Sequence, residues 1–466
     1  MAKVRYPPGP RSLSPLGQMQ GFERDPLAFL ENAAHEYGDI VHFRLGPNHL
    51  YLFNHPDYIR DLLVTDSRNF HKGKALKRAN ALLGNGLLTN EGESHLRQRR
   101  LVQPAFHRQR LAGYAGVMAD CAARTSDRWQ DGAQVDIHHE MMRLTLAVVG
   151  KTLFDADVEG EADEIGSALT LALELFGQRL SFFGPLLDRL PLPSNRRFRE
   201  AQARLNATIY RIIDEHRAGS RDRGDLLSML LLAQDTDGSG MTDRQVRDEA
   251  MTLFLAGHET TANALTYMWY LLGRHPEAEA RLHQEVDRTL GDRLPTFDDL
   301  PRLQHTRRIM CEAMRLYPPA WVVGRMALAD YPVGDYVVPA GSGILASQWV
   351  MHHDPRYYPD PYRFDPERWT PETEAARPKF SYFPFGGGPR MCIGEQFAWT
   401  EGILMLATLA RRWQLRPVAG RPVELRPLIT LRPRDGLPMT LQRRPDTVTM
   451  PRAEVKQGPK ELSQHQ

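Results

Sequence analysis

The feature that most limits how this chain can fold is a glycine-rich loop in its last quarter. It reads Phe383-Pro-Phe-Gly-Gly-Gly-Pro-Arg-Met-Cys392-Ile-Gly, and an apolar helical pattern continues from about Gly394 to Arg412. Glycine allows the backbone to approach a bulky group closely, and proline stiffens a turn. The loop therefore places a single thiol at the start of a helix.

Two interpretations of Cys392 differ in chemistry. A lone cysteine usually serves as a small apolar filler. Here, however, the backbone N–H groups of Ile393 and Gly394 are expected to point at the sulfur from a helix N-terminus, which stabilises a thiolate. Arg390 adds positive charge and suits a carboxylate. A thiolate with backbone donors, one open face and a nearby arginine meets the needs of a thiolate-ligated haem.

Composition excludes several classes of protein. The 466 residues carry 59 Lys+Arg against 57 Asp+Glu, so no nucleic-acid-binding surface is expected. The three cysteines, Cys121, Cys311 and Cys392, are too few for a disulfide framework and indicate a reducing compartment. We expect no signal peptide or membrane anchor, because no run reaches the about 18 apolar residues of a spanning helix. These features predict a cytoplasmic protein.

The periodicity of apolar residues predicts a mostly α fold with a minor β part, that is, an α+β class. Helical spacing dominates from about Arg97 to Met314, whereas alternating segments at Ile40–Leu45 and Leu50–Phe53 predict a hairpin. After Pro318 the chain turns to short strands and loops. We expect one domain over residues 1–444, with a β-rich part at about 38–55 and 320–442 and a helical part at about 56–318 and 394–412. Residues 445–466 are predicted to be a disordered tail.

Within the cysteine loop that begins at Phe383, the stretch from Phe385 to Gly394 resembles the haem-binding loop of the cytochrome P450 monooxygenases. It matches the spacing of phenylalanine, glycine, arginine, cysteine and glycine in that family. The resemblance extends from about Pro7 to Gln442. It implies the P450 fold, roughly a triangular prism, with haem between the long central helix and the cysteine-bearing helix. It also implies that Cys392 is the axial ligand of the iron, with cofactor contacts from Phe385, Gly388, Ile393 and Gly394.

A second motif, Ala256-Gly-His-Glu-Thr-Thr261, lies inside a long apolar helical pattern. Apolar neighbours indicate that Glu259 and Thr260 are both buried, and buried polar groups need a reason. Gly257 lowers helix propensity and permits a local opening of the helix. In the family that this chain resembles, such an acid and threonine organise proton delivery. The resemblance therefore assigns Glu259 and Thr260 as the catalytic residues.

Two further motifs are weak alone and gain meaning together. Glu312-Ala-Met-Arg315 has an i, i+3 spacing that is common on helix surfaces and contributes little there. Phe364-Asp-Pro-Glu-Arg368-Trp contains an arginine that resembles the third partner of this pair in the P450 family. The resemblance implies a structural network of Glu312, Arg315 and Arg368 that supports the cysteine loop and is needed to retain haem.

The propionates of a haem require cationic partners or hydrogen-bond donors. By the spacing of the family, His95, Arg99, Arg325 and Arg390 are expected to hold them. The density of arginines on the early helix also fits a solvated face, or a surface that receives an acidic electron-donor protein. These arginines are Arg97, Arg99, Arg100, Arg108 and Arg110.

Position in the family also indicates which segments line the substrate pocket. Their side chains are mostly apolar, which favours a lipophilic substrate: a fatty acid, a terpenoid, or a steroid-like or polyketide-like molecule. Any core contains such residues, so the pattern alone discriminates poorly. The candidates are Leu87, Leu88, Phe176, Leu255, Ala256, Val322, Leu428 and Ile429.

The implied activity is that of a monooxygenase of EC class 1.14, which uses haem b and O2 and inserts one oxygen atom into its substrate. Electrons are expected from NAD(P)H through a ferredoxin or flavodoxin-type donor with its reductase, because no fused reductase follows, and the protein is expected to be a monomer. A peroxide-driven peroxygenase, a haem-thiolate sensor and a helical protein with a structural cysteine are the alternatives. The intact Glu259-Thr260 pair argues against the peroxygenase.

Overall fold

A computed structural model of the chain describes residues 5–157, 160, 162–179, 190, 192–219, 223–233 and 240–445. The predicted disordered tail lies outside these residues, except for Pro445. The chain is still anchored at Arg444, whose guanidinium donates to Asp287 (Nη2 to Oδ2, 2.7 Å) and whose backbone N–H donates to Arg412 O.

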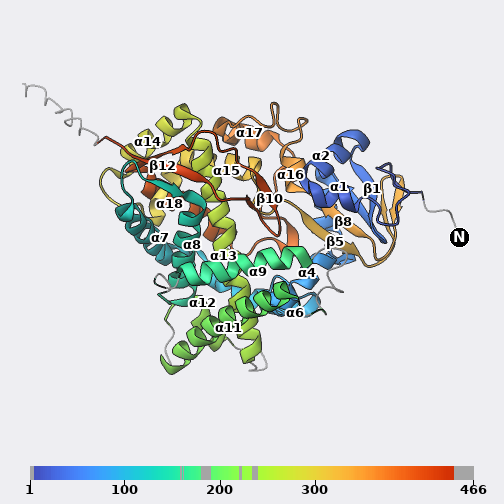
Figure 1. Ribbon diagram of the computed structural model, residues 1–466, viewed down its shortest axis with the longest axis horizontal. Coiled ribbons are helices and arrows are strands. Elements are labelled where there is room, and N and C mark those ends of the chain that lie inside the picture. The colour runs from blue at the N-terminus through green and yellow to red at the C-terminus, as the bar shows by residue number, and fades with distance from the viewer. Residues whose placement is uncertain are drawn as a thin grey trace, which may run out of the picture.

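A 30-residue helix, α13 (Asp243–Leu272), passes through the middle of the molecule (Figure 1). It begins at a capping box, in which the Thr242 hydroxyl accepts from the Gln245 N–H and the Gln245 side chain accepts from the Thr242 N–H. Most of its residues are buried, because α8 (Ile137–Phe154), α15 (Gln304–Leu316) and α18 (Glu395–Ala410) pack around it. A helix covered on several sides can be apolar all round.

The other helices surround this centre or cover the sheet. They are α1 (Met19–Arg24), α2 (Pro26–Tyr37), α3 (Pro56–Arg60), α4 (Lys74–Arg78), α5 (Asn80–Leu83), α6 (Gly92–Val102), α7 (Arg108–Arg128), α9 (Ala162–Arg179), α11 (Pro193–Gly219), α12 (Leu226–Leu232), α14 (Pro276–Leu290), α16 (Gln348–His352) and α17 (Pro371–Ala376). Short 3-10 helices are η2 (Ser67–Asn69), η3 (Gln103–Phe106), η5 (Phe297–Arg302), η6 (Pro366–Trp369), η7 (Lys379–Ser381) and η8 (Gly388–Arg390); η1 (Asp61–Thr65) is a π-helix.

The main sheet lies to one side of the helices, beside α1, α2 and α16 (Figure 1). Its strand order is β1-β2-β8-β5-β3, and only the β2–β8 pair in it is parallel. The strands are β1 (Ile40–Leu45), β2 (Asn48–Phe53), β3 (Phe70–Lys72), β5 (Val323–Ala327) and β8 (Gly343–Ala346). This sheet positions the site, because β3 and β5 place Lys72 directly opposite Arg325.

Three smaller sheets complete the β part. They contain β4 (Gln134–Asp136), β12 (Pro438–Arg443) and β9 (Trp413–Pro417); β6 (Tyr331–Val333) and β7 (Tyr336–Val338); and β10 (Leu425–Pro427) and β11 (Leu431–Pro433). The predicted α+β class is thus confirmed, and the predicted hairpin is present with its second strand starting at Asn48. Across the described ranges, no helix is both long and apolar enough to cross a membrane.

Candidate functional site

The cysteine loop is a tight turn that ends at the N-terminus of α18. The Cys392 backbone N–H donates to Phe385 O at 3.0 Å, and Gly394 is the N-cap of the helix. The thiol is exposed, yet the protein around it desolvates it and raises its pKa to about 11, while the Gly394 backbone N–H acts to lower it. A side chain that is accessible inside surrounding protein faces an internal space.

The middle of α13 is open in the same way. Ala256 is exposed and Gly257 and Thr260 are half-buried, although their neighbours along the helix are buried. Residues one turn apart lie on one face of a helix, so Ala256 and Thr260 share an open face. An open face on a central helix and an accessible thiol before the adjoining helix are what an internal site for a bulky group requires.

Four cationic side chains and one histidine gather near this loop. They are Lys72 on β3, His95 and Arg99 on α6, Arg325 on β5 and Arg390 on η8. Burial lowers the pKa of Lys72 to about 8, of His95 to about 4 and of Arg325 to about 10, and the positive charge of Arg390 lowers all three further. His95 is therefore neutral at pH 7.

This cluster has the chemistry of an anion site. Glu91 acts on Lys72, His95 and Arg325, and Glu249 also acts on Lys72. Among the residues that the structure describes, the buried Nε of Arg325 has no hydrogen-bond partner. Buried positive charge of this density calls for further anionic groups, and the two propionates of a haem would supply them. The residues of the site therefore fit a haem on two independent grounds, the accessible thiol and the excess of cations.

Arg390 has partners within the protein, and its predicted contact with a propionate stays a prediction. Its guanidinium donates to Ser67 O at 3.1 Å, to Phe70 O at 3.0 Å and to the Glu91 carboxylate at 2.8 Å. It therefore fastens the cysteine loop to β3 and to the start of α6. Arg99 lies closer to the thiol, because it donates to Met391 O at 2.7 Å.

Lys72 was not found by sequence analysis. Its ammonium is buried and donates to Leu87 O at 2.9 Å and Asn90 O at 2.7 Å. A lysine at the end of a short strand is ordinarily solvated, and nothing in the surrounding sequence marks this one. Only the pairing of β3 with β5 reveals that it belongs to the cationic cluster.

The structure gives two of the loop glycines a further reason, whereas the predicted approach to a bulky group stays a prediction. At Gly388 (φ +67°), a Cβ would lie 2.0 Å from Leu63 O, and at Gly387 it would lie 2.7 Å from the Phe380 ring. Gly386 (φ +73°) has open space at the Cβ position. The close approach that excludes a side chain at Gly387 and Gly388 is thus to the protein itself, so these glycines serve to seat the loop on η1 and η7.

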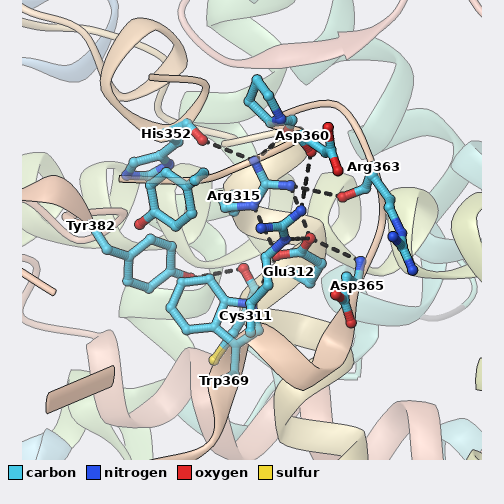
Figure 2. Close-up of polar contacts among 12 residues, drawn as sticks. Cys311, Glu312, Arg315, His352, Asp360, Arg363, Asp365, Trp369 and Tyr382 are labelled. Carbon is cyan, nitrogen blue, oxygen red and sulfur yellow. Dashed lines mark hydrogen bonds and ion pairs between the residues drawn. The ribbon is translucent and has the colours of Figure 1, made fainter. Parts of the chain in front are cut away.

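Of the predicted network, Glu312 and Arg315 are fully buried (Figure 2), and Arg368 is half-buried beside them. Arg315 forms two bonds of 2.8 Å with the Glu312 carboxylate and donates to the backbone carbonyls of His352, Pro361 and Arg363. Glu312 also accepts from the Asp365 N–H at 3.0 Å and the Trp369 indole at 2.8 Å. Arg368 Nε lies 3.5 Å from Glu312 Oε1, at the edge of the pair.

This network adjoins the beginning of the cysteine loop. The His352 Nε2 accepts from the Phe383 N–H at 3.1 Å, and the Tyr382 hydroxyl donates to Cys311 O at 3.0 Å (Figure 2). The carbonyl of His352 is in turn held by Arg315. The contacts therefore run without a break from the buried ion pair to the residue at which the loop begins.

Glu259 and Thr260 turn to different partners. Glu259 is buried, which raises its pKa, and its Oε1 accepts from the Thr430 hydroxyl at 2.6 Å. Thr260, predicted to be buried as well, is half-buried, and its hydroxyl donates to Ala256 O at 2.9 Å. Within the described part of the chain, no hydrogen bond joins Glu259 to Thr260. Sequence analysis paired these residues, and it missed Thr430.

The predicted pocket segments are held against α13 by carboxylates that sequence analysis also missed. Asp248 accepts from the Asn85 N–H at 2.8 Å, and Glu249 accepts from the Leu87 N–H at 3.0 Å. The pair of adjacent acids in an otherwise apolar helix was the sequence feature that could have indicated these contacts. The predicted pocket residues differ in exposure: Leu87 and Leu255 are buried, Val322, Leu428 and Ile429 are half-buried, and Leu88 and Ala256 are exposed. The side chain of Phe176 lies outside the described residues.

Comparison with known proteins agrees with this geometry. The family model described as Cytochrome P450 matches residues 7–437. Cyclooctatin synthase of Streptomyces melanosporofaciens is 44% identical over 432 residues, 92% of this chain and 94% of that protein. Cyclooctat-9-en-7-ol 5-monooxygenase of the same organism is 41% identical (88% and 90% covered), and pentalenene oxygenase of Streptomyces avermitilis is 38% identical (88% and 93% covered).

The buried ion pair generates a stability prediction. Glu312→Ala leaves the buried Arg315 guanidinium without its carboxylate and is expected to cost about 3–5 kcal/mol in the free energy of unfolding. The control is Glu367→Ala, whose half-exposed carboxylate pairs with Arg281 and Arg308 and is expected to cost about 1 kcal/mol or less. Urea unfolding of both variants measures the difference, and equal losses would contradict the described burial.

The loop glycines generate a second prediction. Gly386→Ala and Gly388→Ala both place a Cβ on backbone with positive φ, at a cost of about 1–2 kcal/mol. Only Gly388→Ala also drives that Cβ into Leu63 O, so it is expected to lower the melting temperature and the haem content more than Gly386→Ala. The two variants are compared by thermal unfolding and by haem absorbance per protein. Indistinguishable values would show that η1 does not constrain the loop.

Proposed function

This chain belongs to the cytochrome P450 family and is a haem-thiolate monooxygenase, and we propose that its substrate is a lipophilic, ring-containing terpenoid. Such enzymes use haem b and O2, with electrons from NAD(P)H through redox partners. Of the substrate classes predicted from the sequence, the terpenoid class is favoured by relatives named for oxidising cyclooctat-9-en-7-ol and pentalenene. The accessible thiol of Cys392, just before the helix α18 that packs against α13, is the observation that carries the proposal.

In this proposal Cys392 ligates the haem iron, and the Gly394 N–H stabilises its thiolate. His95, Arg99 and Arg325, together with Lys72, bind the propionates. Arg390 keeps the loop in place through Glu91. The haem supplies the activation of O2, from which one oxygen atom enters the substrate and the other leaves as water.

Glu259 and Thr260 are proposed to manage the protons that this reaction consumes. The Thr260 hydroxyl lies on the open face of α13 and donates its hydrogen to Ala256 O, so its oxygen can accept from a group in the internal space. Glu259 is next in sequence and buried, so its carboxyl can hold a proton away from bulk water. The pair provides a route for protons that keeps water from the reacting atoms.

The pocket is proposed to bind its substrate through apolar contacts. Leu87 and Leu255 are buried beside the open face of α13, and Val322, Leu428 and Ile429 are half-buried in loops that the family places over the haem. None of these side chains can pair with a charge. Affinity then comes from burial of the apolar surface of the substrate, and regiochemistry from the shape of the pocket.

The electron donor is proposed to be a ferredoxin or flavodoxin-type protein with its reductase. Arg100 and Arg108 are exposed at α6 and the start of α7, and this basic surface suits an acidic partner. We also propose that the enzyme acts as a monomer in the cytoplasm.

Thiolate ligation is tested by the carbon monoxide difference spectrum of the reduced protein. The wild type is expected to show a Soret band strongly red-shifted from that of histidine-ligated haem, and Cys392→Ser to lose it. Cys311→Ser, which alters a buried thiol outside the loop, is the control and should keep the band. An unchanged band in Cys392→Ser would refute the assignment.

Substrate class is tested by titrating the oxidised enzyme with cyclooctat-9-en-7-ol, pentalenene and a long-chain fatty acid. A terpenoid that fills the pocket is expected to displace water near the iron and shift its spin state at micromolar concentration. Turnover is then compared with NADPH and a ferredoxin system and with hydrogen peroxide alone. A spin-state shift with the fatty acid only would refute the terpenoid proposal, and turnover supported only by peroxide would favour the peroxygenase.

A further inference from the structure

A chain of hydrogen bonds from three separate elements ends at the buried carboxyl of Glu259. His138 on α8 contacts Asn263 on α13 (Nε2 to Oδ1, 3.1 Å). Asn263 Nδ2 donates to the Thr430 hydroxyl at 3.3 Å, and Thr430 donates to Glu259 Oε1 at 2.6 Å. Thr430 lies in the turn between β10 and β11, directly after Leu428 and Ile429.

The hydrogen positions in this chain follow from its chemistry. An ionised carboxylate only accepts, so the single hydrogen of the Thr430 hydroxyl goes to Glu259. Thr430 must then accept from Asn263, which presents its amide group and leaves its carbonyl oxygen toward His138. That oxygen carries no hydrogen, so His138 donates from Nε2. Every donor in the chain is directed toward the carboxyl of Glu259.

The positive charge near Glu259 also favours the ionised form of its carboxyl. The buried guanidinium of Arg432 on β11 has Nη1 4.0 Å from Glu259 Oε1, and its Nη2 lies 2.8 Å from Glu174 on α9. Other buried titratable groups of this region are His138 on α8, His258 on α13, and Glu401 on α18, which interacts with Thr261. Burial lowers the pKa of His138 to about 4 and that of His258 to about 3, so both are neutral at pH 7.

We propose that Thr430 is a positioning residue for oxygen activation, one that holds the Glu259 carboxyl in place and keeps it able to release a proton, with Asn263 and His138 orienting the Thr430 hydroxyl. This inference rests on the proposed proton role of Glu259. An acid in a dry interior tends to retain its proton. The Thr430 hydroxyl opposes this tendency, because it stabilises the ionised form by a charge-assisted hydrogen bond.

The neighbours of Glu259 support this assignment. Burial raises its pKa, and the Thr430 hydroxyl followed by Arg432 act to lower it. Thr266, on the same helix, provides a contrast. It is equally buried, but its hydroxyl donates to Ala262 O of its own helix at 2.7 Å and reaches no carboxyl.

The test is a pH titration of the oxidised holoenzyme by infrared difference spectroscopy, which follows the C=O stretch of a protonated carboxylic acid. Glu259→Gln identifies the band. In Thr430→Val, the titration midpoint is expected to rise by about one pH unit, the amount that corresponds to the loss of one charge-assisted hydrogen bond. Thr430→Ser keeps the hydroxyl and should retain the wild-type midpoint. Thr266→Val is the matched control and should also leave it unchanged.

An unchanged midpoint in Thr430→Val would overturn the inference, as would an equal shift in Thr266→Val. If Thr430→Val does not fold, Thr430→Ala removes the same hydroxyl and is judged by the same criterion.

A second readout separates this inference from the proposed proton role. It is the fraction of NADPH electrons released as hydrogen peroxide during turnover with a terpenoid that shifts the spin state. A shifted midpoint together with more peroxide supports both proposals. A shifted midpoint with unchanged peroxide in both Thr430→Val and Glu259→Gln supports the positioning role and overturns the proton role of Glu259.

Discussion

The buried ion pair between Glu312 and Arg315 is the interaction on which the rest of the site depends. Two charges away from water are tolerated only if every donor and acceptor is satisfied, and here backbone carbonyls and N–H groups from distant segments complete the set. The pair thus dictates where the segment from His352 to Trp369 lies. That segment holds Phe383, where the cysteine loop begins. An ion pair that does not contact Cys392 therefore determines where its thiol lies.

The cationic cluster is the opposite case, because its charges are not balanced by the chain. Burial and the positive charge of Arg390 lower the affinity of Lys72, His95 and Arg325 for protons, and Glu91 acts on all three in the opposite sense. Local inconsistency of this kind is expected where function requires it. The cofactor of this family carries two carboxylates, so the energetic cost of gathering the cations is offset when the haem binds. Folding and cofactor binding are consequently linked at this site.

Helix α13 connects several parts of the site, because its polar residues face several directions. Asp248 and Glu249 hold the loop that carries Leu87, Glu259 turns toward Thr430, and the Thr260 side opens to the interior. A long helix that is buried along most of its length cannot tilt toward one partner without disturbing the others. The loop with Leu87, the proposed proton residues Glu259 and Thr260, and the turn with Leu428 are therefore coupled through one rigid element.

Sequence alone determined the features that depend on local spacing: the helical class, the thiol at the start of a helix, and Glu312 and Arg315 on one helical face. These follow from periodicity and from the order of motifs along the chain. Only the tertiary structure decided which groups Arg390 contacts, that Lys72 belongs to the cationic cluster, and that the Glu259 carboxyl faces Thr430. Each of these joins residues far apart in the chain, such as Glu259 and Thr430, and which distant residues meet is decided by strand pairing and helix packing.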